Sequence, residues 1–329
     1  MRQSGRVQSR VAIVPARMSG SRLVAIGVLV AAALAACGSG DPSGEVTTAL
    51  AVRQRPTTRS HVVVLVMENK EQGRVLGSRS APFLNRLARR GGVAAQSYGV
   101  RHPSLPNYIA LVSGSTQGIT DDCTGCSANA PNIAGQLEAA HRTWGAYLEG
   151  LPRPCARPAF AGRYAKKHDP FAYDDSIAAD PARCRRRMPL RRLAADIRGD
   201  RLPDFAFIAP DLCNDTHDCS VRTGDRFLAR VVPAVVSALG PHGFLVVTYD
   251  EGDSDRGCCG GSHGGLIATV VAGPDVRPGA RMTQPIDHYG VLGSIEDAFD
   301  LARLGDARDA RHGSLAPVFR GGRVPRLPR

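Results

Sequence analysis

The sequence is poor in aromatic residues, which make up 5% of its 329 residues and include a single tryptophan. Proteins that hold single-stranded nucleic acid place aromatic side chains among basic ones, because the bases stack on the rings. Here the arginines are scattered, apart from the groups at 185–187 and 191–192. We therefore expect no nucleic-acid partner, although the formal net charge is +12. A basic chain of this kind favours anionic substrates or surfaces.

Acidic residues are missing from the first 36 positions, which contain five arginines and the apolar run LVAIGVLVAAALAA. The run is too short for a comfortable membrane span, but it suits the central region of a signal peptide. Met18 offers a second start, from which residues 1–17 would not be translated. Removing residues 1–36 with their five arginines lowers the formal charge from +12 to +7, so the mature chain remains basic.

The signal segment ends in Leu34-Ala35-Ala36-Cys37, which resembles a bacterial lipobox. In that motif the cysteine is lipidated and becomes the first residue of the mature protein. The alternative is a plain secretory signal that is cleaved after one of the alanines. We expect an exported cell-envelope lipoprotein anchored at Cys37, or alternatively a secreted protein. Residues 37–58 are small, polar and proline-containing, and they predict a flexible tether.

A second CxxC motif, or a histidine pair at zinc-finger spacing, is absent, so we do not expect structural zinc at the CTGC segment. Eight cysteines remain when Cys37 is set aside, and an even number in an exported chain indicates disulfides. They fall into four local groups, and we expect pairing within each group, which the sequence alone does not prove: Cys123/Cys126, Cys155/Cys184, Cys213/Cys219 and Cys258/Cys259.

Buried strand patterns alternate with helical ones from residue 59 onward. Continuous apolar runs, typical of strands buried on both faces, occur at 61–69, 204–211, 243–253 and 266–274, and a shorter strand is predicted at 143–148. Apolar spacing predicts helices at 81–92, 131–141, 224–239 and 288–302. This alternation predicts an α/β fold with a mostly parallel central sheet and helices on both faces. We expect one domain over residues 59–318 and a frayed basic tail at 319–329.

Polar residues follow three of the predicted strands where each strand ends. Glu68 and Asn69 end the first, Asp250 and Glu251 end the strand at 243–253, and the 204–209 strand is followed by Asp211, Asn214, Asp215 and His217. In open α/β sheets, ligands bind beyond the carboxyl ends of the strands. Three carboxylates and one amide that converge there would repel one another unless they held a cation. Taken singly, each is an ordinary polar residue at a strand end; together they predict one divalent metal ion.

Ser104 lies in the segment HPSLPNYIALVSG, directly before an apolar helical stretch. One interpretation is an ordinary helix cap, with proline in the first turn. The other uses the partial positive charge of the helix start, which favours a phosphate, and gives Ser104 the role of a metal-activated nucleophile. Asn107 would then hydrogen-bond a phosphate oxygen. Histidines 102, 168, 217, 263 and 288 occur mostly in loops, where they are able to stabilise a phosphoryl group or protonate a leaving oxygen.

The segments HVVVLVMEN, HPSLPNYIALVSG, YAKKHDPF, NDTHDCS, VVTYDEGD and DHYGVLGSIED occur in this order between about residues 61 and 301. Together they resemble the bacterial phosphoesterase family, which contains acid phosphatases and phosphocholine-type phospholipases C and belongs to the alkaline-phosphatase-like superfamily. The resemblance implies a three-layer sandwich and a metal held by Glu68, Asn69, Asp250 and Glu251. It also implies a nucleophile at Ser104, catalytic roles for His168 and His217, and phosphate contacts from His102, Asn107, Lys167 and His288.

The function that these features predict is a metal-dependent phosphomonoesterase that works through a phosphoserine at Ser104. The substrate would be a phosphorylated small molecule or a phospholipid head group, and we expect a monomer that meets the membrane only through Cys37. The alternatives are a phospholipase C-type phosphodiesterase on the same scaffold and a non-catalytic lipoprotein that binds phosphate or metal. A sulfatase is not expected, because the C-x-P-x-R motif that carries its nucleophile is absent from the sequence.

Overall fold

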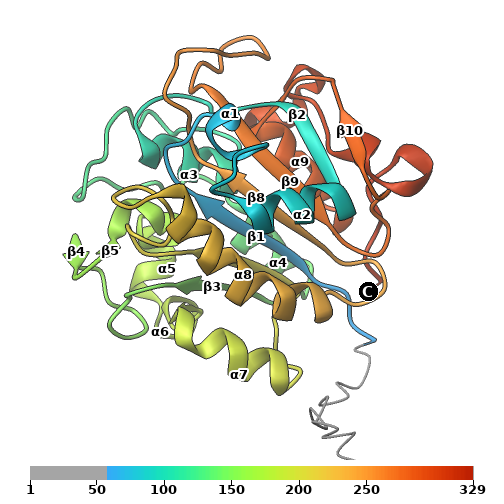
Figure 1. Ribbon diagram of the computed structural model, residues 1–329. Coiled ribbons are helices and arrows are strands. Elements are labelled where there is room, and N and C mark those ends of the chain that lie inside the picture. The colour runs from blue at the N-terminus through green and yellow to red at the C-terminus, as the bar shows by residue number, and fades with distance from the viewer. Residues whose placement is uncertain (1–57, 329) are drawn as a thin grey trace, which may run out of the picture. The chain divides into compact units, whose positions relative to one another are not determined.

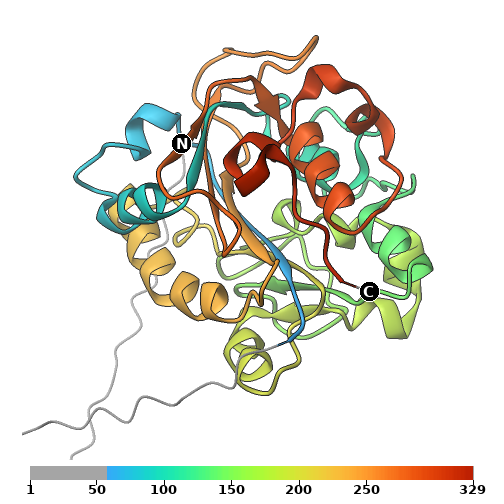
Figure 2. The same cartoon turned by 90° about the vertical axis from the view of Figure 1, so that its right-hand side faces the viewer.

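The computed structural model describes residues 58–328 (Figures 1 and 2). The signal segment, Cys37 and all but the last residue of the predicted tether therefore lie outside the described residues. Within 58–328, none of the helices combines the length and the apolar character that crossing a bilayer requires.

A mixed sheet of nine strands forms the centre of the domain, in the order β10-β2-β9-β8-β1-β7-β3-β6, with β11 also paired to β2. The strands are β1 (Val62–Met67), β2 (Gly92–Tyr98), β3 (Trp144–Leu148), β6 (Arg187–Pro189), β7 (Phe205–Ala209), β8 (Phe244–Tyr249), β9 (Leu266–Ala272), β10 (Ala280–Met282) and β11 (Ile286–Asp287). Only β9 runs antiparallel to its neighbours β8 and β2; every other pairing in this sheet is parallel. The prediction of a mostly parallel sheet is confirmed.

Helices cover both faces of the sheet, as the alternation in β1 requires. Val63 and Leu65 point into a core formed with α2 (Pro82–Arg90), α7 (Leu193–Arg198) and α8 (Val221–Ser237). Val62 and Val64 point into a second core formed with α3 (Ser104–Ser113), α4 (Ile133–Ala139) and α9 (His288–Ala298). Figure 1 shows α2, α7 and α8 in front of the sheet, and Figure 2 shows the layers from the side. The fold is therefore α/β with three layers.

Several short elements were not predicted. They are β2, β6, β10, β11, α1 (Gln72–Val75), α5 (Asp175–Ala179), α6 (Pro181–Cys184), α7, and the hairpin of β4 (Phe160–Ala161) and β5 (Tyr164–Ala165), which leads into the 3₁₀ turn η1 (Lys166–His168). The sequence of β2 is GVAAQSY, which has one β-branched residue and no alternation of apolar and polar side chains. Its place between β9 and β10 depends on tertiary packing, which a local pattern does not reveal.

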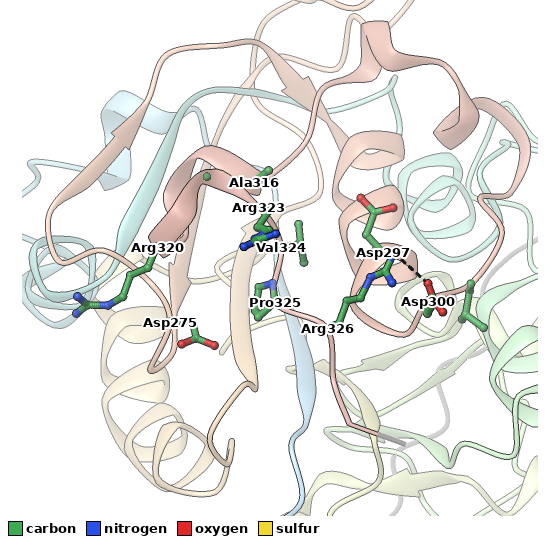
Figure 3. A pocket seen from close by; sticks show the side chains of 11 residues that line it. Asp275, Asp297, Asp300, Ala316, Arg320, Arg323, Val324, Pro325 and Arg326 are labelled. Carbon is green, nitrogen blue, oxygen red and sulfur yellow. Dashed lines mark ion pairs between the residues drawn. The ribbon is translucent and has the colours of Figure 1, made fainter.

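The cysteines form the four expected bonds between neighbours, Cys123–Cys126, Cys155–Cys184, Cys213–Cys219 and Cys258–Cys259. The basic tail, in contrast, differs from the expectation of a frayed end. Val324 and Leu327 are buried, and the Leu327 amide donates to the carbonyl of Ala298 at 2.8 Å. Arg326 also pairs with Asp300 at 3.2 Å (Figure 3). The apolar residues between the arginines therefore pack residues 319–328 against the end of α9.

One buried acid in α9 makes stability depend on pH. Glu296 is fully buried; its Oε1 accepts from the Leu304 amide at 2.8 Å, whereas Oε2 has no hydrogen-bond partner. Burial raises the pKa of this carboxyl from 4.5 to about 8. Between pH 4.5 and about 8 the folded protein therefore keeps a proton on Glu296 that the unfolded chain releases. The free energy of unfolding falls as the pH rises through this range.

We expect Glu296→Gln to become progressively more stable than the wild type as the pH rises from 5 to 8. Glutamine keeps the acceptor for Leu304 and carries no charge. The difference should grow by up to about 1.4 kcal/mol per pH unit, the slope for one linked proton. Urea unfolding of both proteins at pH 5, 6.5 and 8 measures it. A difference that stays constant over this range would contradict the ionisation of Glu296 as the cause.

Candidate active site

Three adjacent parallel strands deliver the polar cluster. β1 lies between β7 and β8, with Val62 in register with both Phe205 and Phe244, so the three strands end together. The segments beyond them are joined through the backbone: the Asn69 amide donates to Asp250 Oδ1 at 3.0 Å, and the Glu68 amide donates to the Asp215 carbonyl at 2.9 Å. The convergence predicted at the carboxyl edge of the sheet is present.

Glu68, Asp250 and Glu251 surround the side-chain amide of Asn69. One atom of that amide lies 3.1 Å from Glu68 Oε2, 3.2 Å from Glu251 Oε1 and 3.3 Å from Asp250 Oδ1. All three acids are at least 95% buried. If the amide presents its nitrogen, it donates to the carboxylates; if it presents its oxygen, that oxygen and three carboxylate oxygens are grouped together. The second arrangement is the kind of donor set that hard divalent cations take, so these residues fit a metal ion.

Two residues next to the cluster have a left-handed backbone. Asn69 has φ +47°, a region that asparagine tolerates better than most residues, and Thr216 has φ +85°, which is unusual for a β-branched residue. The Thr216 hydroxyl donates to the carbonyl of Glu68 at 2.8 Å. Such strain is held only where surrounding contacts fix the chain, and here it lies beside the acidic cluster.

Ser104 faces the carboxylates and does not cap its helix. Its hydroxyl donates to Glu68 Oε2 at 3.0 Å and also lies 3.5 Å from oxygens of Asn69 and Glu251. The helix start is served by another residue, because the Leu105 amide donates to Asp122 Oδ1 at 2.9 Å and no side chain at the cap position accepts a hydrogen bond. The capping interpretation of Ser104 is therefore wrong.

Lys167 provides a cation beside the serine. Its ammonium group donates to Ser104 Oγ at 3.3 Å, to Asp122 Oδ2 at 2.9 Å and to His217 Nε2 at 3.3 Å. Burial opposes the charged form of Lys167, but the nearby carboxylates of Glu68, Asp122 and Asp250 outweigh it and raise its pKa. The His217 ring is about one-quarter exposed and is bound through Nδ1 to Asp218 at 2.7 Å, so it stands at the open side of the cluster.

His168 lies on the closed side. Its side chain is 3% exposed, with Nε2 at 3.2 Å from Glu68 Oε1 and Nδ1 at 3.3 Å from Asp215 Oδ2. Nε2 and the Asp215 oxygen have no hydrogen bond of acceptable geometry. The Tyr108 hydroxyl donates to Glu68 Oε1, and the Tyr108 ring stacks on His168. Donor atoms of Glu68, His168 and Asp215 lie within 4.8 Å of one another, so Glu68 belongs to two groups of possible ligands.

The pKa values of the acids in the cluster are raised, because the carboxylates are buried and too few positive charges lie near them. Burial, together with the charges of Asp250 and Asp215, raises the pKa of Glu68 well above its ordinary value. Burial also raises the pKa of Asp250, that of Asp215 to about 8, and that of Glu251 to about 9. The same burial lowers the pKa of His168 well below 6.5. A divalent cation among these side chains would remove the repulsion that holds protons on the acids.

Two residues expected to touch phosphate have other contacts. Asn107 Oδ1 accepts from the amides of Val100 and Arg101, and its Nδ2 donates to the carbonyls of Arg101 and Pro103. The side-chain amide of Asn107 already makes all the hydrogen bonds that it can form, so none is left for a substrate. Its contacts fix the loop before Ser104. His288 is buried, and its Nε2 donates to the carbonyl of Asp250 at 2.6 Å. These contacts hold the loop before Ser104 and the end of β8, and His288 Nδ1 has no hydrogen-bond partner among the described residues.

His102 is at the rim of the site, where Nδ1 bonds Glu251 Oε2 and Nε2 lies 3.2 Å from the Ser254 carbonyl. Sequence reasoning missed two residues of the cluster, Asp122 and Tyr108, and it placed Asp215 at the sheet edge without giving it a role. Asp122 belongs to no predicted strand end, and Tyr108 falls within an apolar helical stretch. Only Asp215 had a signal, its place in the loop that follows a buried strand.

The large cavity drawn in Figure 3 is not this site. It has a volume of about 890 Å³ and is lined by Asp297, Asp300 and the arginines of the C-terminal segment. These aspartates lie at and just beyond the end of α9, whereas its first residue, His288, contacts Asp250. Eleven helical residues span about 16 Å, so the cavity and the acidic cluster lie near opposite ends of α9.

Residues 78–302 match the Phosphoesterase family. A phosphatidylinositol-3-phosphatase of Mycobacterium tuberculosis is 35% identical over 290 residues, which cover 88% of this chain and 91% of that protein. An acid phosphatase of Aspergillus fumigatus is 29% identical over 232 residues, covering 67% of this chain and 51% of that protein, so the match spans about half of the fungal relative.

Solved structures show the same fold at low sequence identity. A protein of the alkaline phosphatase superfamily from Vibrio parahaemolyticus is 14% identical with a TM-score of 0.50, and the match covers 78% of this chain and 71% of the other. The PsFucS1 sulfatase from Pseudoalteromonas is 13% identical with a TM-score of 0.51, covering 82% and 74%. The chain belongs to the Phosphoesterase family, and it is a hydrolase of phosphoric ester bonds.

Proposed function

We propose that the protein is a metal-dependent phosphomonoesterase that transfers the phosphoryl group to Ser104 and then to water. The observation that carries the proposal is the position of Ser104 Oγ, 3.0 Å from Glu68 and 3.3 Å from the Lys167 ammonium, at the start of a helix. A hydroxyl between an acidic cluster and a cation is suited to attack phosphorus.

Glu68, Asn69, Asp250 and Glu251 are the residues that would hold the metal ion. A bound divalent cation supplies Lewis-acid chemistry, which makes a nearby hydroxyl more acidic and offsets negative charge on phosphate oxygens. Tyr108 orients the second oxygen of Glu68 by donating to it, and His168 packs behind the same oxygen, stacked on the Tyr108 ring. We place His168 in this positioning role, because burial keeps it from the open side of the cluster where a leaving group would depart.

In the first step Ser104 Oγ bonds to phosphorus and releases its proton to solvent, because Glu68 Oε2, to which the hydroxyl donates, belongs to the set of residues that would hold the metal. Lys167 stabilises the charge on Oγ as the proton leaves. The bond from phosphorus to the ester oxygen breaks, and His217 at the open side, after taking a proton from solvent on Nε2 in place of its contact with Lys167, protonates that oxygen. In the second step water attacks the phosphoserine, His217 takes a proton from the water, and Ser104 Oγ takes a proton from solvent as its bond to phosphorus breaks. The products are an alcohol and inorganic phosphate.

The relatives guide the choice of substrate. One is named a phosphatidylinositol-3-phosphatase and others are named acid phosphatases, and each of these names describes a phosphomonoesterase. We propose phosphomonoesters, including those carried on an inositol phospholipid head group, as the substrate class. A phosphodiester of the phosphatidylcholine type is the comparison that separates this proposal from a phospholipase C activity.

We expect Ser104→Ala to lower kcat on a generic aryl phosphate by several orders of magnitude, as deletion of a nucleophile does. Wild type and variant are assayed side by side on the aryl phosphate, on phosphatidylinositol 3-phosphate and on phosphatidylcholine. Acid quenching of the wild type during turnover should trap phosphate on Ser104, detectable by peptide mass. Full activity of Ser104→Ala would refute the nucleophile. Faster turnover of phosphatidylcholine than of either monoester would favour the diesterase.

A second prediction concerns the metal and has a readout independent of activity. Saturation with the correct divalent ion at 100 times its Kd should stabilise the protein by about 2.7 kcal/mol. Asp250→Asn should raise the melting temperature of the chelator-treated protein, because one of the repelling carboxylates is gone, and should abolish the response to metal. Melting curves with chelator and with Mg²⁺, Mn²⁺, Ca²⁺ or Zn²⁺ test both. An equal response of wild type and variant, or none to any ion, would contradict the site.

We also propose that the mature protein begins at a lipidated Cys37 and is held at the cell envelope by that lipid. This rests on the sequence of residues 34–37 alone. The N-terminal peptide of the protein from detergent-extracted membranes should carry a diacylglycerol on Cys37, and Cys37→Ser should move the protein into the soluble fraction. An unmodified N-terminus after one of the alanines would support the plain secretory signal.

A further inference from the structure

Asp122 lies beside the nucleophile and uses both carboxylate oxygens there. Oδ1 accepts from the Leu105 amide at 2.9 Å, and Oδ2 accepts from Lys167 at 2.9 Å. The first contact satisfies a backbone donor at the start of α3, and the second joins the serine's helix to η1. One side chain therefore ties together the two elements that carry Ser104 and its neighbouring cation.

The contact with Leu105 has a consequence for Ser104. A serine at a helix start commonly turns its oxygen back to the backbone amides. Here the aspartate supplies that acceptor from another segment, and Ser104 Oγ points instead to Glu68. The contact with Lys167 fixes the ammonium group on the other side of Oγ at 3.3 Å.

The loop around Asp122 is firmly anchored. The Cys123–Cys126 disulfide closes the turn directly after it, and both cysteines pack against a small core of Leu105, Ile109, Ile119, Ala128, Ala172 and Tyr173. Lys166 donates to the Thr124 carbonyl at 2.6 Å and lies over the Tyr173 ring. Two consecutive lysines of η1 therefore hold this loop, but only Lys167 reaches Ser104.

We infer that Asp122 is a positioning residue of the phosphoesterase reaction, which directs the Ser104 hydroxyl at the acidic cluster and holds Lys167 against it. The inference rests on the proposed role of Ser104. It assigns a function to the Cys123–Cys126 loop, which keeps the Asp122 carboxylate between helix α3 and η1.

The test compares three single variants with full-length wild type on a soluble aryl phosphate. Asp122→Ala should lower kcat about 100-fold, the scale expected when a reacting group loses its alignment, with KM changed less than threefold. Asp122→Asn keeps an oxygen for the Leu105 amide but loses the charge that holds Lys167, and should lower kcat about tenfold. Asp180→Ala is the matched control, because Asp180 caps α6 through the amides of Ala182 and Arg183; its kcat should equal that of the wild type.

A double-mutant cycle separates positioning from a general loss of structure. Because Asp122 acts partly through Lys167, Asp122→Asn should cost less than threefold in kcat when Lys167 is already methionine. The inference is overturned if Asp122→Ala keeps the wild-type kcat, or if the effects of Asp122→Asn and Lys167→Met on kcat multiply independently. It is also overturned if kcat falls in proportion to the melting temperature across all variants, the control included. Activity that survives in Ser104→Ala would refute the proposed nucleophile instead, whatever the Asp122 variants show.

Discussion

The acidic cluster is the constraint on which the rest of the site depends. Glu68, Asp250 and Glu251 are placed around one amide in an interior that water hardly reaches, where like charges repel far more strongly than in solvent. The protein balances part of this charge with the Lys167 ammonium and with the hydroxyls of Ser104 and Tyr108. Three acids against one lysine leave a deficit of positive charge, and a divalent cation would remove it. The nucleophile therefore stands where negative charge is already concentrated and where a cation is most strongly attracted.

The parallel strands of the sheet bring these acidic side chains together. Because β1 lies between β7 and β8 and runs parallel to both, side chains far apart in sequence emerge side by side from a rigid floor. The backbone amides of Asn69 and Glu68 donate hydrogen bonds to Asp250 and Asp215, and these bonds join the ends of the strands. The positions of the acids are thus set largely by the main chain and its strained turns at residues 69 and 216, and only secondarily by contacts between the acids themselves.

Much of this arrangement was predictable because it follows from simple periodicity. Apolar runs gave the main strands, and polar residues directly after them gave Glu68 and Asp250. The pattern failed where the chemistry depends on the direction of a side chain. Asn107 and His288 share segments with the expected site, yet the Asn107 amide and His288 Nε2 bond backbone atoms of the fold, and a motif does not record that. Asp122 comes from an irregular loop whose place beside Ser104 is decided by tertiary contacts, so no local signal pointed to it.

The single reversed strand, β9, has an evolutionary consequence. Antiparallel neighbours need no helical crossover, so the segment from Asp250 to Gly265 leaves the catalytic edge and returns to it without crossing the sheet. Its return is locked where Gly264 packs on the backbone of Gly99 and Arg101, too close for any side chain. Between these fixed ends lies the Cys258–Cys259 turn, in a stretch of chain that insertion or deletion can remodel while the framework stays unchanged. Sequence change in this segment is thereby separated from the acidic residues at the end of β8, which the pairing of β8 with β1 holds in place.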